Sequence, residues 1–165
     1  MDLRAIQKPI KEKYRSNPNS SRITLKAFGD QSDSPIACSV EVGHKILESQ
    51  AHSGVGGPGT AACSGDLLLG ALAACAQLTC QLVATAMGIP VNRIRVEVDG
   101  EMDLSGTLGI SKEVPVGFQD IHARFHIEAP DATEEQLIAL QEKTEQYCVV
   151  LQTLLNPPQI RTSWS

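Results

Sequence analysis

Aromatic and basic side chains are both scarce in this chain of 165 residues. Aromatic residues make up only 4% of it, and 14 Lys and Arg are outnumbered by 19 Asp and Glu, which gives a net charge of −5. Nucleic-acid-binding proteins usually present a basic face, and those that hold single strands add aromatic stacking platforms. The composition therefore argues against a nucleic-acid partner, and acidity of this kind keeps a protein soluble.

The N-terminus also lacks the apolar core of a secretory signal, because its first eleven residues read MDLRAIQKPIK. We therefore expect a cytoplasmic protein. The chain has five cysteines, an odd number that does not suit a fully paired extracellular framework: Cys38, Cys63, Cys75, Cys80 and Cys148. In a reducing cytosol thiols are free by default, so any disulfide here would be transient and functional.

Neither the cysteines nor the histidines are spaced as metal ligands. The spacing Cys63-x11-Cys75-x4-Cys80 matches no zinc pattern, and the four histidines are not at ligand spacing either: His44, His52, His122 and His126. We expect no metal and no cofactor.

Charge is absent from one long stretch, from Leu67 to Asn92. Its pattern predicts a helix from about Asp66 to Met87, capped by Ser64 or Asp66 and ended by Gly88. A helix that is apolar all round is either buried on all sides or lies in a membrane. Polar residues within it and the lack of basic or aromatic anchors beside it argue against a membrane. We expect a central helix, covered by a sheet and by a second subunit.

Alternating apolar and polar residues predict strands on both sides of this helix. Before it, a hairpin closes around Gly29–Pro35 and is extended by a third segment; after it come two half-buried antiparallel strands. The predicted segments are Ile23–Ala27, Ile36–Val42, Lys45–Glu48, Arg93–Asp103 and Ile121–Glu128. Strands, helix, strands and helix in this order indicate an α+β protein with mainly antiparallel sheets.

A second, polar helix is predicted to start near Asp131, with Thr133 and Gln136 as a capping box. It would contain Cys148, break at Asn156–Pro158, and turn Leu140, Thr144 and Tyr147 inward with Leu137 and Leu151. Residues 160–164 read as a last edge strand. We divide the chain into residues 1–21, an N-terminal arm or short helix, and residues 22–165, the main domain.

The segment SGDLLLGALAAC, from Ser64 to Cys75, resembles the hallmark of the OsmC/Ohr family, named for osmotically inducible protein C and organic hydroperoxide resistance proteins. That hallmark is an acidic residue, Leu-Leu, and an Ala-rich turn that ends in a reactive cysteine. The resemblance covers about residues 22–165, with further matching segments in the right order: Met87–Pro90, Val96–Leu104, Val114–Gln119, Glu145–Cys148 and Thr153–Pro157.

This resemblance implies an OsmC-like fold in which antiparallel sheets enclose two central helices of an intertwined homodimer. It also implies thiol-dependent reduction of organic hydroperoxides in oxidative stress defence, with a dithiol as reductant. By position, Cys75 would be the peroxidatic thiol and Cys148 the resolving thiol. A thiolate attacks the peroxide, becomes a sulfenic acid and condenses with a nearby thiol to a disulfide. Thiol exchange then restores the pair.

The sequence departs from the family pattern around the reactive cysteine. Active members use an arginine from an N-terminal loop and a glutamate near the start of the reactive helix. Here Gly29–Ser34 contains no arginine, and the shorter Asp66 stands at or beside the acidic position, where it can equally be a helix cap. Val149 follows Cys148 where proline is common. Two alternatives therefore stay open: a non-catalytic dimer that binds a small apolar or thiol-reactive ligand, and a scaffold whose cysteines are all structural.

Overall fold

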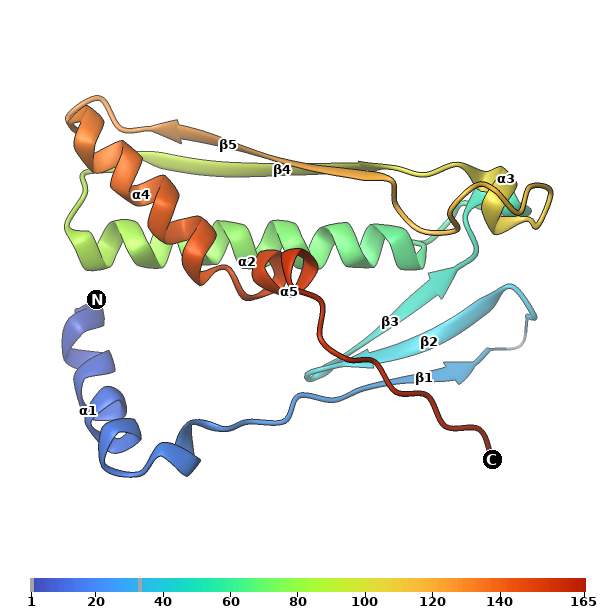
Figure 1. The fold of residues 1–165 in the computed structure, drawn as a ribbon, viewed down its shortest axis with the longest axis horizontal. Helices are drawn as coiled ribbons and strands as arrows, with labels where there is room; N and C mark the ends of the chain where they lie inside the picture. Colours follow the sequence, from blue (N-terminus) through green and yellow to red (C-terminus); the bar gives the residue numbers. More distant parts are fainter. Residues whose placement is uncertain (1, 33) are drawn as a thin grey trace. The chain divides into compact units, whose positions relative to one another are not determined.

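The structure, a computed structural model, describes residues 2–32 and 34–165 (Figure 1). Its helices and strands fall into two compact units, each with its own internal contacts. The first unit comprises the residues up to Leu69 together with Gly100–Ile121. The second comprises Gly70–Asp99 and His122–Ser165. Helix α2 and strands β4 and β5 contribute residues to both units.

The first unit contains a three-stranded antiparallel sheet in the order β1-β2-β3, with β1 Ala27–Gln31, β2 Ala37–Val42 and β3 Lys45–Gln50. Gly43 has a φ of 60° in the turn from β2 to β3, a backbone conformation that glycine adopts without the steric cost of a Cβ. The other elements are α1 Leu3–Ser16, the short 3-10 helices η1 Pro18–Ser21 and η2 Ser53–Val55, and α3 Leu104–Thr107.

The predicted hairpin is confirmed, but its first strand is four residues later than we expected. Ala27 pairs with Val42, so Ile23–Lys26 would have to pair with residues 43–46. The chain turns back at those residues into β3, and the described residues therefore offer the segment before Ala27 no strand to pair with. Ile23 and Leu25 are 75% and 86% exposed.

The second unit is built on a hairpin of β4 Arg93–Glu101 and β5 Asp120–Glu128, packed against α2 Ser64–Met87 and α4 Glu134–Tyr147. Figure 1 shows the two strands running in opposite directions alongside α2. The predicted alternation is confirmed in β5, where every second residue is half-buried, and β4 follows it except at Glu97, which is half-buried as well. The buried cluster at the centre of this unit consists of Cys80, Ala84, Ile89 and Leu140, and Phe125, Ile127 and Ile94 pack against it.

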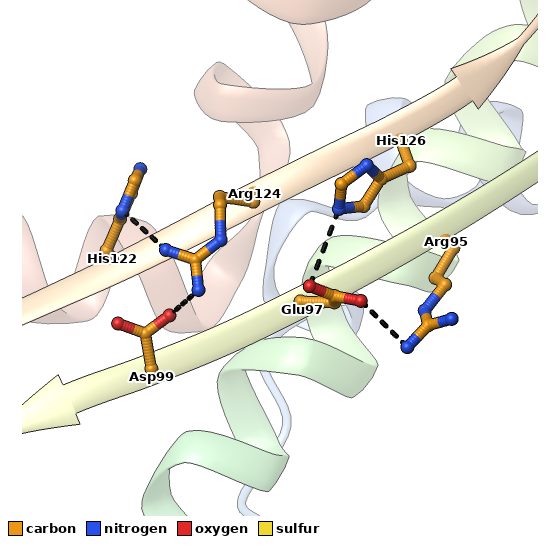
Figure 2. A network of polar contacts seen from close by, with 6 residues as sticks. All are labelled: Arg95, Glu97, Asp99, His122, Arg124 and His126. Atoms are coloured by element: carbon orange, nitrogen blue, oxygen red, sulfur yellow. Dashed lines mark hydrogen bonds and ion pairs between the residues drawn. The ribbon is translucent and has the colours of Figure 1, made fainter.

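The opposite, solvent-facing side of this hairpin carries a polar network (Figure 2). Glu97 bonds Arg95 on its own strand at 2.7 Å and His126 on the neighbouring strand at 3.5 Å. Arg124 bonds Asp99 across the strands and His122 along its own strand. Exposed pairs of this kind contribute little to stability individually, so the network chiefly keeps this face polar.

Helix α2 confirms the predicted charge-free helix, but the described residues of this chain bury only one of its faces. Its buried residues are four apart along one stripe: Leu72, Ala76, Cys80 and Ala84. Leu78 and Leu82 are 59% and 44% exposed. By length and composition alone α2 is apolar enough to cross a membrane, a test that core helices of soluble proteins also pass. Burial on all sides therefore requires something beyond the described chain.

Three predictions for the C-terminal part are wrong. The second helix is not continuous through Cys148: α4 ends at Tyr147, Cys148 is extended with φ −71° and ψ 103°, and α5 runs over Val149–Leu155. Residues 160–164 form no strand in the described chain, and Ile160 is 82% exposed. Tyr147 is also 59% exposed, so it is not part of the inner stripe, whereas Leu140 and Thr144 are buried as predicted.

Candidate active site

Cys75 lies in the middle of α2 and is half-buried. Its Sγ atom is 4.0 Å from Oγ1 of Thr79, one turn further along the helix. Residues four apart lie on the same face of a helix, so the hydroxyl stays beside the thiol.

The break between α4 and α5 brings Cys148 and the first backbone N–H groups of α5 to Cys75. The Cys148 N–H donates to the Thr144 carbonyl at 2.9 Å, which closes α4, and the Cys148 carbonyl accepts from Gln152 N–H at 2.9 Å, which opens α5. The first N–H groups of a helix have no partner within it and are free to serve another group. The Cys148 side chain is completely buried.

These surroundings lower the pKa of Cys75. Burial raises the pKa, as it does for any thiol, but four hydrogen-bonding groups outweigh it: the N–H of Val150, the thiol of Cys148, the hydroxyl of Thr79 and the N–H of Val149. Each of these groups stabilises the thiolate more than the thiol. Among the described residues, no charged side chain contributes to this shift.

The same contacts shift the pKa of Cys148 in the opposite direction. Burial raises this pKa most, and the neighbouring Cys75 raises it further, while the N–H groups of Leu151 and Val150 lower it by less. When one proton leaves the pair, it therefore leaves Cys75, and Cys148 remains a thiol that hydrogen-bonds to the thiolate. A thiolate beside a neutral thiol is the arrangement in which a sulfenic acid, once formed, can be converted to a disulfide.

Asp66 helps to start α2. Its Oδ2 accepts a hydrogen bond of 2.9 Å from the N–H of Cys63, the residue before the first helical turn. This is the backward half of a capping box, in which the third helical residue satisfies the N–H of the cap position. The bond to the Cys63 backbone also lowers the pKa of Asp66, with smaller contributions from the Cys63 side chain and His52. The predicted cap is thus present at Asp66 rather than Ser64, and a catalytic part for Asp66 stays a prediction.

The other cysteines lie outside this pair. Cys80 is buried beside Thr144, and burial raises its pKa by more than the Thr144 hydroxyl lowers it. Cys38 and Cys63 are half-buried, and all five thiols are free. The part of the chain that the structure describes contains no group of His, Cys, Asp and Glu suited to a metal ion.

Sequence reasoning found both thiols but missed the backbone groups that act on Cys75. Val149 and Val150 act through their N–H groups, so their side chains carry no signal of the role. Thr79 could have been found, because it stands four residues after Cys75 within an apolar helix.

The first unit holds a cavity of about 890 Å³ around the start of α2. Its walls are largely apolar, with Leu69, Met102, Leu104 and Phe118 among them, and its polar groups include His52. A cavity of this size is large enough for a small organic ligand.

The family model for OsmC-like proteins matches residues 57–163, which is more than half of the chain. The chain belongs to the OsmC family. The match includes α2 with Cys75 and the whole segment from β4 to α5 with Cys148. No curated protein matches the sequence significantly.

Solved structures of OsmC-family proteins share this fold. An OsmC-like protein from Mycoplasma pneumoniae matches with a TM-score of 0.67 and 16% identity over 82% of this chain and 89% of its own. Organic hydroperoxide resistance proteins from Elizabethkingia anophelis and Legionella pneumophila match with TM-scores of 0.62 and 0.63 and 19% identity each. They cover 82% and 81% of this chain, and 91% and 90% of their own lengths. At these identities the likeness shows the fold alone.

Proposed function

We propose that this OsmC-family protein is a thiol-dependent peroxidase that reduces organic hydroperoxides in oxidative stress defence. The observation that carries the proposal is the opposite shift of two adjoining thiols, with the pKa of Cys75 lowered and that of Cys148 raised. Groups whose surroundings push their pKa values apart are well suited to different roles in one reaction. Cys75 is the peroxidatic thiol and Cys148 the resolving thiol.

The reaction has three steps. The Cys75 thiolate attacks the terminal oxygen of the hydroperoxide, the O–O bond breaks, and the alkoxide leaves with a proton as the alcohol, so Cys75 becomes a sulfenic acid. The Cys148 thiol then attacks that sulfur, water leaves, and a Cys75–Cys148 disulfide forms. A dithiol reductant exchanges with this disulfide, returns both cysteines to thiols and becomes a disulfide itself.

Activation of Cys75 in this scheme needs no arginine from the Gly29–Ser34 segment. Hydrogen bonds to a thiolate lower its pKa as a neighbouring cation does, although each does so by less. The N–H of Val150, the Cys148 thiol and the Thr79 hydroxyl together supply this stabilisation. Asp66 supports the site by fixing the start of α2. We also propose a direct catalytic role for its carboxylate.

We further propose that the protein acts as an intertwined homodimer in the cytoplasm, without a membrane or a nucleic acid as partner. The exposed apolar side chains of α2, among them Leu78 and Leu82, support a second subunit. Contiguous exposed apolar side chains often mark protein interfaces. The net charge of −5 supports a protein that does not bind nucleic acid.

Turnover of tert-butyl hydroperoxide with dithiothreitol tests the function. We expect Cys75→Ser to abolish turnover, Cys148→Ser to allow one oxidation of Cys75 with much slower cycling, and Cys80→Ser to retain activity as the matched control. Full activity of Cys75→Ser would refute the peroxidase proposal.

A non-catalytic OsmC-like dimer that binds a small apolar ligand is the second candidate. The observation that favours it is the cavity of about 890 Å³ in the first unit. An ordinary pKa for Cys75, together with no peroxide turnover with any dithiol, would favour this candidate over the first.

A further inference from the structure

Helix α1 is basic in an otherwise acidic protein. Residues 1–26 carry seven basic and two acidic side chains, a net charge of +5, whereas residues 27–165 carry seven basic and seventeen acidic ones, a net charge of −10. The basic residues of α1 recur three and four apart along one face: Arg4, Lys8, Lys11 and Arg15. Neighbours at this spacing share a side of the helix.

A second face of α1 is apolar. Ile6, Ile10 and Tyr14 follow Leu3 at helical spacing, and they are 49%, 43% and 38% exposed. Within the described chain α1 packs chiefly against η1. A helix with one basic and one apolar face is built to lie in an apolar groove or on a surface of negative charge.

The second unit contains an apolar groove with acidic residues, which complements the apolar and basic faces of α1. Its volume is about 500 Å³, and it is lined by residues of β5 and α4 together with Cys80 of α2. Phe125 and Ile127 of β5 and Leu137 and Ile138 of α4 make it apolar, and Ile138 is 52% exposed.

The charges along this groove are acidic. Glu134 and Glu145 line it at the two ends of α4, and no basic residue is among the described residues that line it. Lys143 of α4 is not among the lining residues and lies over the Tyr147 ring. Helices α1 and α4 are both 14 residues long, about 21 Å each, so one can lie along the other for its full length.

We propose that α1 of one copy docks in the β5–α4 groove of a second copy, with its apolar face on the groove and its basic face, from Arg4 to Arg15, beside Glu134 and Glu145. The described residues that line the groove come from α2, β5 and α4, so α1 can enter it as a separate element. The inference goes beyond the proposed peroxidase activity and does not depend on the chemistry of Cys75.

The distribution of charge favours a second copy of this chain, rather than a lipid surface, as the partner to which α1 binds. An anionic membrane would attract α1 but repel the remaining residues, which carry a net charge of −10. The groove attracts α1 and buries its apolar residues in the same contact. Because both sides of the contact are on this chain, each copy in an assembly offers one helix and one groove.

Photo-crosslinking of the full-length protein tests the contact. A benzophenone amino acid replaces Ile10, and protein grown in ¹⁵N is mixed with unlabelled protein before irradiation. We expect cross-links from position 10 to peptides within residues 123–145, and we expect pairs of mixed isotope, which only two copies can give. Cross-links confined to a single isotope, or none to residues 123–145, would overturn the proposal.

Charge reversal provides the specificity control. Lys8→Glu with Lys11→Glu should reduce the cross-link several-fold, and adding Glu134→Lys with Glu145→Lys should restore it. Lys45→Glu with Lys112→Glu makes the same change of charge outside α1 and should leave the yield unchanged. Raising salt from about 0.1 M to about 1 M, which shortens the Debye length from about 10 Å to about 3 Å, should lower the yield.

Two further outcomes distinguish this proposal from lipid binding by α1 and from the proposed peroxidase activity. Cosedimentation with vesicles of phosphatidylglycerol and phosphatidylcholine that depends on Lys8 and Lys11, without the cross-link, would assign α1 to a lipid surface instead. Cys75→Ser should leave the cross-link intact, so that loss of peroxidase activity and loss of docking are distinguishable.

Discussion

At the scale of residues, Cys75 and Cys148 carry the same side chain, and their surroundings shift its pKa in opposite directions. Both are penalised by burial, but Cys75 receives hydrogen bonds from Val150 and Thr79, whereas Cys148 faces the Cys75 thiolate. The nucleophile in thiol chemistry is the thiolate, so a lower pKa makes Cys75 the more reactive group at neutral pH.

The pH dependence of alkylation should therefore differ between the two thiols. The thiolate fraction rises as pH passes the pKa, so modification of Cys75 should reach its plateau below the pH at which an ordinary thiol does. Modification of Cys148 should reach it above that pH. Iodoacetamide rates measured on each peptide, normalised to their own high-pH plateau so that access cancels, test this expectation. Coincident profiles would contradict it.

At the scale of elements, the extended residue between α4 and α5 is what directs backbone N–H groups at Cys75. Val149 and Val150 occupy the first two positions of α5, where N–H groups have no intrahelical partner. Proline is well tolerated at a first helical position and prefers an extended residue before it, which Cys148 is.

Two proline variants separate the contributions of these N–H groups. Val149→Pro removes the weaker of the two and should keep the fold, with a small rise in the pKa of Cys75. Val150→Pro removes the stronger and should raise that pKa further and slow peroxide reduction. The thiolate absorbance of each variant against pH, with circular dichroism as the folding control, measures the effect. A larger rise for Val149→Pro would show that the assignment is wrong.

The start of α4 supplies a test of stability that is independent of the active site. The Thr133 hydroxyl accepts from Gln136 N–H at 3.2 Å, and the Gln136 side chain accepts from Thr133 N–H at 3.0 Å. Thr133→Ala should lower the free energy of unfolding by about 1 kcal/mol, as loss of a helix cap does. Thr85→Ala is the matched control, because that hydroxyl only bonds back to Gln81 within α2. Urea unfolding of both variants should show no comparable loss for Thr85→Ala.

Elements with strong local signals could be predicted from the sequence. The charge-free run fixed α2, strict alternation fixed β4 and β5, and the Thr133–Gln136 pair marked the start of α4. The break at Cys148 was missed because apolar spacing continues from α4 into Leu151, and periodicity alone does not report a single extended residue. The strand predicted at residues 160–164 has the right alternation, but a strand also needs a hydrogen-bonded neighbour, which the described chain does not supply.

The two cysteines of the thiol pair could be predicted from the sequence, but the groups that shift their pKa values could not. The motif that ends at Cys75 pointed to one cysteine, and the segment Glu145–Cys148 pointed to the other. The groups that set their pKa values are backbone N–H groups, and these depend on where helix α5 begins rather than on residue type.

At the scale of the whole molecule, one face of α2 is apolar and exposed, and a single copy of the chain does not account for it. Leu78 and Leu82 stand exposed on a helix without charge, while the opposite stripe is packed into the core. Covering a leucine removes about 1.5–3 kcal/mol of unfavourable contact with water, so a second subunit over this face is stabilising.

Leu78→Glu should therefore weaken the proposed dimer. A carboxylate buried at the subunit interface would lack a partner, and the dissociation constant should rise more than tenfold. Ile110→Glu, at a position that is 76% exposed in the loop after α3, is the matched control and should leave assembly unchanged. Sedimentation equilibrium of both variants gives the measurement. An unaltered dimer for Leu78→Glu would place the interface elsewhere.

The central claim is that Cys75 and Cys148 form one redox pair. Its most direct test is peptide mapping after one equivalent of tert-butyl hydroperoxide is added to the fully reduced protein in the absence of reductant. We predict a Cys75–Cys148 disulfide as the main product, and a sulfenic acid on Cys75 in the Cys148→Ser variant. An oxidised protein in which Cys75 is still a free thiol would contradict the account.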